Sequence, residues 1–128
     1  MRLDHLAIWV NNLEKMKEFY MKYFNMDSNE MYENSKKQFT SYFLSYENGL
    51  RIELMHKPTV FDALQEKGIT NGLAHFAIST GDKNKMMELT ETLRNDGYII
   101  QSEPRLTGDG YYESVVLDPE NNLIEITN

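Results

Sequence analysis

The sequence predicts an α+β fold built from two similar modules, each consisting of a strand, a helix and three further strands. The main observation behind this prediction is an internal repeat. The letters HLAI at residues 5–8 recur as HFAI at 75–78, and RIEL at 51–54 recurs loosely as LIEI at 123–126. Each half of the chain therefore begins with a histidine and ends with a glutamate, and the same kinds of element are expected in the same order between them.

One helix is expected in each half. The first begins after Asn12, a residue type that caps helix N-termini well, and the second begins after Asp82. Apolar residues recur at helical spacing in both, which places them on one face of each helix. These residues are Leu13, Met16, Tyr20 and Tyr23 in the first helix, and Met86, Leu89 and Leu93 in the second. The second helix should end near Gly97, which can adopt the left-handed conformation common after a helix.

The remaining strands are expected after the two helices. They are residues 30–32, 39–46 and 50–55 in the first half, and residues 98–102, 111–117 and 123–127 in the second. Asn48-Gly49 predicts a hairpin between two of them, and residues 118–122 predict a turn between the last two. A short connecting helix is expected over residues 58–68. The expected division is thus a single domain with module 1 at residues 1–56, a connector at 57–71 and module 2 at 72–128.

Composition excludes several classes of protein. The 128 residues carry 20 acidic and 13 basic side chains, a formal charge of -7, so a nucleic-acid partner is not expected. The chain has no cysteine, which excludes disulfides, thiolate nucleophiles and cysteine zinc sites. No apolar run reaches the length of a membrane span. We expect one protein domain in the cytoplasm, without a membrane partner.

The alternation of side chains along the strands points to a metal site. His5 alternates with Leu6 and Ile8, and Glu53 alternates with Ile52 and Leu54. The same parity holds in the second half, so four polar side chains should face away from the core. These are His5, Glu53, His75 and Glu125. If they converge, two imidazoles and two carboxylates can bind a divalent cation. His56 has no repeat partner and is expected at the surface.

These residues, together with Gly108-Asp109-Gly110 and Asp118-Pro119, resemble the vicinal oxygen chelate superfamily. Within it the chain is similar to the small glyoxalase I-like proteins related to lactoylglutathione lyase. The resemblance implies two βαβββ modules forming an eight-stranded, incompletely closed barrel, the glyoxalase/bleomycin resistance/dioxygenase fold. It also implies that His5, Glu53, His75 and Glu125 bind one divalent metal per site (Ni, Zn, Co, Mn or Fe). It favours a homodimer whose sites are built from both chains and accept a small-molecule substrate.

The activity implied by the resemblance is that of a metal-dependent lyase or isomerase. A proton would move between neighbouring carbons of a small α-hydroxycarbonyl or thiol adduct through a metal-bound enediolate. Glu125 is the first choice for the base that carries this proton, and Glu53 is the second. Two alternatives remain open: another metalloenzyme of the superfamily, such as a dioxygenase or an epimerase, and a non-catalytic protein that binds a small molecule.

Trp9 bears on the substrate. Related enzymes that use glutathione carry an arginine four residues after the first histidine, and this chain has Trp9 there. Glutathione is therefore not the expected thiol. Trp9 shares the parity of His5, so it either lines the substrate pocket or packs at a subunit contact.

Overall fold

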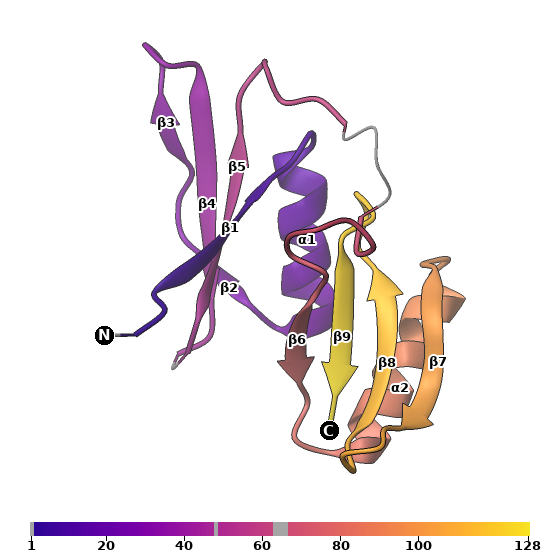
Figure 1. The fold of residues 1–128 in the computed structure, drawn as a ribbon. Coiled ribbons are helices and arrows are strands. Elements are labelled where there is room, and N and C mark those ends of the chain that lie inside the picture. The colour runs from indigo at the N-terminus through magenta and orange to yellow at the C-terminus, as the bar shows by residue number, and fades with distance from the viewer. Residues whose placement is uncertain (1, 48, 63–66) are drawn as a thin grey trace. The chain divides into compact units, whose positions relative to one another are not determined.

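The computed structural model describes residues 2–47, 49–62 and 67–128. Contacts within the chain divide it into two compact units, residues 1–62 and 63–128. Each unit contains one helix and one sheet (Figure 1). The α+β class and the two modules expected from the repeat are thus confirmed, and each module forms a separate open sheet.

The first unit places its helix against a five-stranded sheet. Its elements are β1 (His5–Trp9), α1 (Leu13–Phe24), β2 (Asp27–Ser28), β3 (Tyr32–Asn34), β4 (Phe39–Ser45) and β5 (Arg51–His56). The sheet order is β1-β5-β4-β2, and β3 also pairs with β4. Strand β1 runs parallel to β5, whereas β4 and β5 are antiparallel, as the hairpin prediction required. Residue Asn48 of that hairpin lies outside the described residues.

The second unit repeats this arrangement with four strands. Its elements are β6 (Phe76–Ser79), α2 (Lys83–Asn95), β7 (Ile100–Leu106), β8 (Tyr112–Leu117) and β9 (Leu123–Thr127). The sheet order is β6-β9-β8-β7, with β6 parallel to β9. In each sheet the glutamate of the repeat lies on an inner strand, β5 or β9. The strand parallel to it contains the histidine in the first unit and follows it directly in the second.

The prediction of one strand over residues 30–32 was wrong. Strand β2 ends before this segment, β3 begins only at its last residue, Tyr32, and the pairing with β4 is interrupted between them. Asn29 explains the interruption. Its side-chain oxygen accepts a hydrogen bond of 2.7 Å from the backbone N–H of Phe43, so a side chain takes the place of a ladder carbonyl at this point of β4. The described part of the chain consequently has nine strands rather than eight.

The connector helix expected over residues 58–68 is not present in the part of it that the structure describes. Residues 58–62 and 67–68 form turns and irregular backbone, and residues 63–66 lie outside the described residues. Phe61, one of the two apolar residues that suggested a helix, is 84% exposed. The apolar spacing in this segment therefore does not mark a buried helix face.

Both helix starts were predicted correctly. The side chains of Asn12 and Asp82 each accept a hydrogen bond of 3.0 Å from the backbone N–H three residues later, as N-caps do. Helix α1 packs on β4 and β5, and α2 packs on β7, β8 and β9. The core residues of the helices are fully or almost fully buried: Met16, Phe19, Tyr20, Tyr23 and Phe24 in α1, and Met86, Thr90 and Leu93 in α2. Among the described residues no helix has the length and apolar character needed to cross a bilayer.

A buried polar contact ties α2 to its sheet. The hydroxyls of Thr90 in α2 and Ser114 in β8 are 2.7 Å apart, and both residues are completely buried. The Thr90 hydroxyl also lies 2.8 Å from the carbonyl oxygen of Met86. Because Thr90 can donate to Met86, Ser114 can donate to Thr90, and both hydroxyl groups are satisfied.

Removing both hydroxyls of this contact should cost less than the sum of the costs of removing each one alone. Thr90→Val keeps the side-chain shape but leaves the buried Ser114 hydroxyl without its hydrogen-bond partner. We therefore expect the free energy of unfolding to fall by about 1–3 kcal/mol. Ser114→Ala leaves Thr90 bonded to Met86 and should cost about 1 kcal/mol. In urea denaturation the double variant should lose less than the sum of the two single losses. Strict additivity would show that the hydroxyls do not interact.

Candidate functional site

The first unit brings His5 and Glu53 together through strand pairing. Strands β1 and β5 are parallel, and the register sets Ala7 opposite Glu53. His5 lies two residues before Ala7, so its side chain is on the same face of the sheet as that of Glu53. The result is a separation of 3.7 Å between Nε2 of His5 and Oε2 of Glu53.

The second unit repeats this pair. Ala77 lies opposite Glu125 in the parallel pair of β6 and β9, and His75 precedes Ala77 by two residues. The distance from Nε2 of His75 to Oε2 of Glu125 is 3.4 Å. The structure therefore pairs the four predicted ligands two by two, and each pair occupies the same place in its module. Among the described residues no group of three or more His, Asp or Glu side chains is arranged around a common point.

The spacing within each pair suits two donors of one metal ion. Both separations exceed the length of an ordinary hydrogen bond, about 2.7–3.2 Å. Adjacent ligands of a divalent ion, each about 2.0–2.2 Å from it, lie roughly 3.0–3.4 Å apart in octahedral or tetrahedral geometry. The His75–Glu125 pair is at this spacing and the His5–Glu53 pair is a few tenths of an ångström wider. Each unit thus offers one nitrogen and one oxygen donor at a distance that an ion can bridge.

Both carboxylates are less accessible than their histidines. The side chains of Glu53 and Glu125 are 15% and 17% exposed, whereas those of His5 and His75 are 38% and 44% exposed. Burial raises the pKa of the Glu125 carboxyl, and the nearby Glu113 carboxylate raises it further. His75 and Arg105 act in the opposite direction and lower this pKa.

Glu113 lies on the same face of the sheet as Glu125 but was not among the site residues predicted from the sequence. It lies opposite Thr127 in the pairing of β8 with β9, which puts its side chain on the same face as Glu125. It is buried, and Arg105 in β7 holds it through an ion pair of 2.6 Å. The signal was available in the hairpin of the last two strands, because counting parity back from Glu125 through the turn places Glu113 on the site face.

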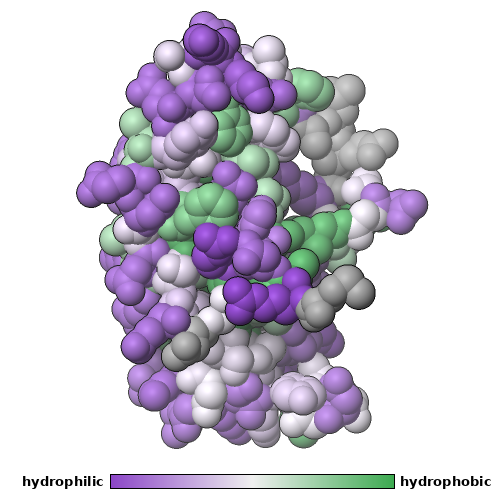
Figure 2. Space-filling model, turned by 90° about the vertical axis from the view of Figure 1, so that its left-hand side faces the viewer, coloured by the Kyte–Doolittle hydropathy of each residue, from purple (hydrophilic) through white to green (hydrophobic). Residues whose placement is uncertain are grey.

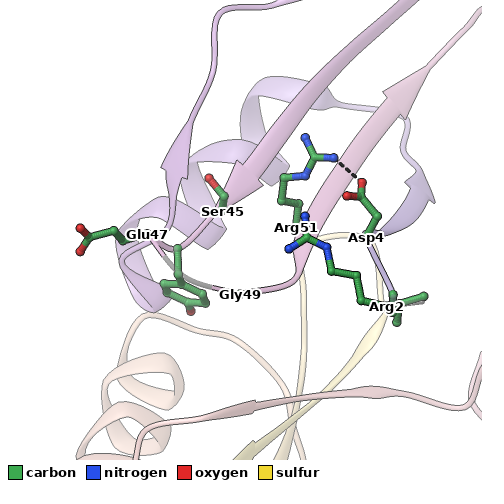
Figure 3. A pocket seen from close by; sticks show the side chains of 8 residues that line it. Arg2, Asp4, Ser45, Glu47, Gly49 and Arg51 are labelled. Carbon is green, nitrogen blue, oxygen red and sulfur yellow. Dashed lines mark hydrogen bonds and ion pairs between the residues drawn. The ribbon is translucent and has the colours of Figure 1, made fainter.

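A second interaction orients His5. Nδ1 of His5 lies 2.9 Å from a carboxylate oxygen of Asp4, and the same oxygen is bound by the guanidinium of Arg51. Hydrogen bonds from His5 and from Arg51 lower the pKa of Asp4, which favours its ionised form. Asp4 and Arg51 also help to line an open surface pocket of about 700 Å³ on the first unit (Figure 3). The other lining residues are Arg2, Leu3, Ser45, Tyr46, Glu47 and Gly49.

Aromatic side chains share the site face of the first unit. Phe43 lies directly opposite Glu53 in the sheet, and its ring meets that of His5 edge-on at 5.4 Å between centroids. Trp9, 44% exposed, meets Phe39 edge-on and carries the ammonium of Lys57 over its ring. On the side of the molecule drawn in Figure 2, hydrophobic surface is open to solvent between hydrophilic side chains. Trp9 has the same parity as His5 in β1, so its partly exposed ring lies on the sheet face that holds His5.

His56, expected at the surface, is instead half-buried. Its Nδ1 lies 2.7 Å from the carbonyl oxygen of Val10. A carbonyl can only accept, so Nδ1 carries the proton and donates it. His56 is the last residue of β5, and its hydrogen bond ties the end of this strand to Val10, just after β1. Its role is structural.

Comparisons with known proteins agree with this architecture. A sequence model described as Glyoxalase/Bleomycin resistance protein/Dioxygenase superfamily matches residues 2–126. The chain belongs to this superfamily. Within it the chain is glyoxalase I-like: it is 31% identical, over 129 residues, to a protein of Vibrio cholerae serotype O1 named "Probable lactoylglutathione lyase". That alignment covers 98% of this chain and 88% of the relative.

Solved structures show the same fold. Glyoxalase I of Zea mays superposes with a TM-score of 0.79 at 22% identity, over 98% of this chain. The chain spans 44% of the length of the maize chain. The trypanothione-dependent glyoxalase I of Leishmania major superposes with a TM-score of 0.81 at 24% identity, covering 100% of this chain and 86% of that one. At these identities the likeness establishes the fold.

The Arg105–Glu113 ion pair should matter more than an exposed ion pair. Arg105→Met leaves the buried Glu113 carboxylate beside Glu125 without a counter-charge, and we expect the free energy of unfolding at neutral pH to fall by about 1–2 kcal/mol. Adding Glu113→Gln to this variant should restore most of the loss, since the uncompensated charge is removed.

The matched control is Arg94→Met, which breaks ion pairs between exposed side chains and should change the free energy of unfolding little. Urea denaturation of the four proteins measures these differences. Equal losses for Arg105→Met and Arg94→Met would contradict a special role for the buried carboxylate.

Proposed function

We propose that this chain is a metal-dependent lyase or isomerase of the glyoxalase I type, acting on a small α-hydroxycarbonyl compound or thiol adduct. The observation that carries the proposal is the presence of two equivalent half-sites, His5 with Glu53 and His75 with Glu125. In each, a nitrogen and an oxygen donor lie at about the spacing of two ligands of one metal ion. Membership of the superfamily and the resemblance to glyoxalase I support the choice of reaction. We further propose a cytoplasmic location, as is usual for such enzymes.

The proposed metal ligands are His5, Glu53, His75 and Glu125. Two imidazoles and two carboxylates form a mixed nitrogen and oxygen set that accepts Ni, Zn, Co, Mn or Fe(II). Each unit supplies half of the set, so a complete site needs two units, from one chain or from two. We propose a homodimer in which each site takes one half-site from each chain.

A divalent ion held by these donors would supply Lewis-acid stabilisation of negative charge on substrate oxygens. Four protein ligands on an octahedral ion would leave two positions for neighbouring oxygens of a substrate. The number of protein ligands distinguishes the proposed site from a three-ligand site with one carboxylate. Both Glu53 and Glu125 are counted here because they occupy equivalent positions in the two units.

Glu125 is proposed to take the proton beside the substrate carbonyl and to return it to the neighbouring carbon. Its carboxyl is largely shielded from water, and its pKa is raised by burial and by Glu113, so it holds a proton more readily than an ordinary glutamate. Glu53 is the second candidate for this role. Its partner across the sheet is Phe43, whereas Glu125 has a carboxylate neighbour, Glu113.

Trp9 is proposed to contact the substrate as a flat apolar wall on the face that carries His5. The ring is partly exposed and is held in place by Phe39 and Lys57. An indole cannot bind a carboxylate as a guanidinium does. The proposed co-substrate is therefore a thiol compound other than glutathione, one that presents no carboxylate to Trp9. The alternative position for Trp9, in a subunit contact, predicts that its exposure falls when the protein dimerises.

A matrix of metals and substrates tests the activity. The metal-free protein is loaded with each divalent ion and assayed with methylglyoxal and several thiols, and with epimerisable acyl thioesters. We expect turnover with at least one pair and complete loss after chelation, restored by adding the ion back. Oxygen consumption instead of isomerisation would favour a dioxygenase, and a protein that binds no divalent ion would contradict the proposal in favour of a non-catalytic binder.

Glu125→Gln separates the base from the ligand role. The amide keeps an oxygen that can bind metal but cannot carry the proton, so turnover should fall by at least 10²-fold while much of the metal remains bound. Glu53→Gln should lose less turnover at similar metal content. Metal analysis and steady-state kinetics on the same preparations give both quantities. Near-normal turnover of Glu125→Gln would refute its assignment as base.

A further inference from the structure

The structure assigns Asp4 and Arg51 as positioning residues that present Nε2 of His5 as the metal donor of the first half-site. This inference rests on the proposed metal function and concerns how one ligand is made ready for the ion. Figure 3 shows the two side chains joined at the edge of the surface pocket.

The proton on the His5 ring follows from its contact with Asp4. An ionised carboxylate can only accept hydrogen bonds, so Nδ1, 2.9 Å from Asp4, must donate. In a neutral imidazole the other nitrogen is then an unprotonated acceptor. That nitrogen is Nε2, the atom that faces Glu53 at 3.7 Å. Asp4 therefore selects the tautomer in which the lone pair points to the place between the proposed ligands.

Arg51 holds Asp4 in this position. Its guanidinium binds the same carboxylate oxygen, and its backbone N–H also donates to the carbonyl oxygen of Asp4. The guanidinium lies over the ring of Phe43, 4.6 Å from its centroid, and that ring in turn packs edge-on against His5. Asp4, Arg51, Phe43 and His5 thus form a closed ring of contacts that restricts the rotation of the imidazole.

The repeat supplies a natural comparison. The equivalents of Asp4 and Arg51 in the second half are Ala74 and Leu123, neither of which can bind an imidazole N–H through its side chain. Within the described residues no hydrogen bond is made to Nδ1 of His75. The orienting contact is therefore specific to the first half-site, and a general requirement of the fold does not explain it. The side chains of Asp4 and Arg51 are 50% and 42% exposed, so the pair is not needed to fill a core.

The tautomers of the three histidines test the inference without any metal or substrate. In ¹⁵N NMR of the metal-free protein at a pH where the rings are neutral, His56 serves as the reference for a ring protonated at Nδ1. His5 should match His56, and His75 should show the Nε2–H form that prevails in water. In Asp4→Ala the His5 signals should move to the pattern of His75, whereas Asp4→Asn, whose amide oxygen still accepts, should retain the Nδ1–H form in large part. A wild-type His5 with the pattern of His75 would overturn the inference.

Zinc affinity gives the functional readout. Competition with a chromophoric chelator should show Zn²⁺ binding weakened by about 10–100-fold in Asp4→Ala, the range for loss of a partner that orients a metal ligand, and by less in Asp4→Asn. Glu103→Gln is the matched control, because it removes an exposed carboxylate from an ion pair with Arg94, away from the half-sites. This variant should bind Zn²⁺ with the affinity of the wild type.

The outcomes separate the inference from the proposed function. A wild-type protein that binds no Zn²⁺ or other divalent ion would refute the metal function and with it the role of Asp4 in metal binding. A wild-type protein that binds Zn²⁺ while Asp4→Ala binds it equally well would refute only the positioning role. Weaker binding in Asp4→Ala, together with the changed tautomer and an unchanged urea midpoint, would support both.

Discussion

The parallel pairing of the histidine-bearing strand with the glutamate-bearing strand is the constraint on which the candidate site depends. Ala7 opposite Glu53 and Ala77 opposite Glu125 set a histidine and a carboxylate on the same face, two residues apart along the sheet. Side chains alternate with a period of two, so a slip of one residue would send either partner into the core under the helix. The buried row that includes Ile52, Leu54, Ile124 and Ile126 resists such a slip, because these residues would then face solvent. Apolar packing on one face thereby specifies polar geometry on the other.

Around this shared frame the two halves have diverged. The first half surrounds its histidine with Asp4 and with the ring of Phe43, and it adds Trp9 to the exposed face. The second half surrounds its glutamate with Glu113 and Arg105, and the counterpart of Trp9 is Ser79. One half thus restrains the imidazole of His5, while the other raises the proton affinity of the Glu125 carboxylate. The proposed division between a firmly oriented metal donor and a proton-carrying base follows from this difference.

Several ionisable side chains on the face that carries the half-sites are buried or partly buried. Burying a charged group is energetically costly unless a group of opposite charge or a hydrogen-bond partner compensates it. Glu113 is buried beside a second carboxylate and is compensated by Arg105 at 2.6 Å. The histidines, by contrast, remain open to solvent on one side. A cation would relieve the repulsion among such carboxylates, so the charge distribution of the second unit is itself consistent with the proposed metal function.

The sequence by itself determined the repeat, the two helices with their caps, and the identity of the paired histidines and glutamates. These depend on local rules, namely cap chemistry, helical spacing and strand parity, that a single chain displays directly. Other features were decided only by tertiary structure. The side chain of Asn29 interrupts the pairing with β4 between β2 and β3, and His56 turns inward to Val10. Each of these involves partners that are at least ten residues apart, and the choice of partner depends on register and on hydrogen-bond competition in the folded chain, which periodicity along the sequence does not contain.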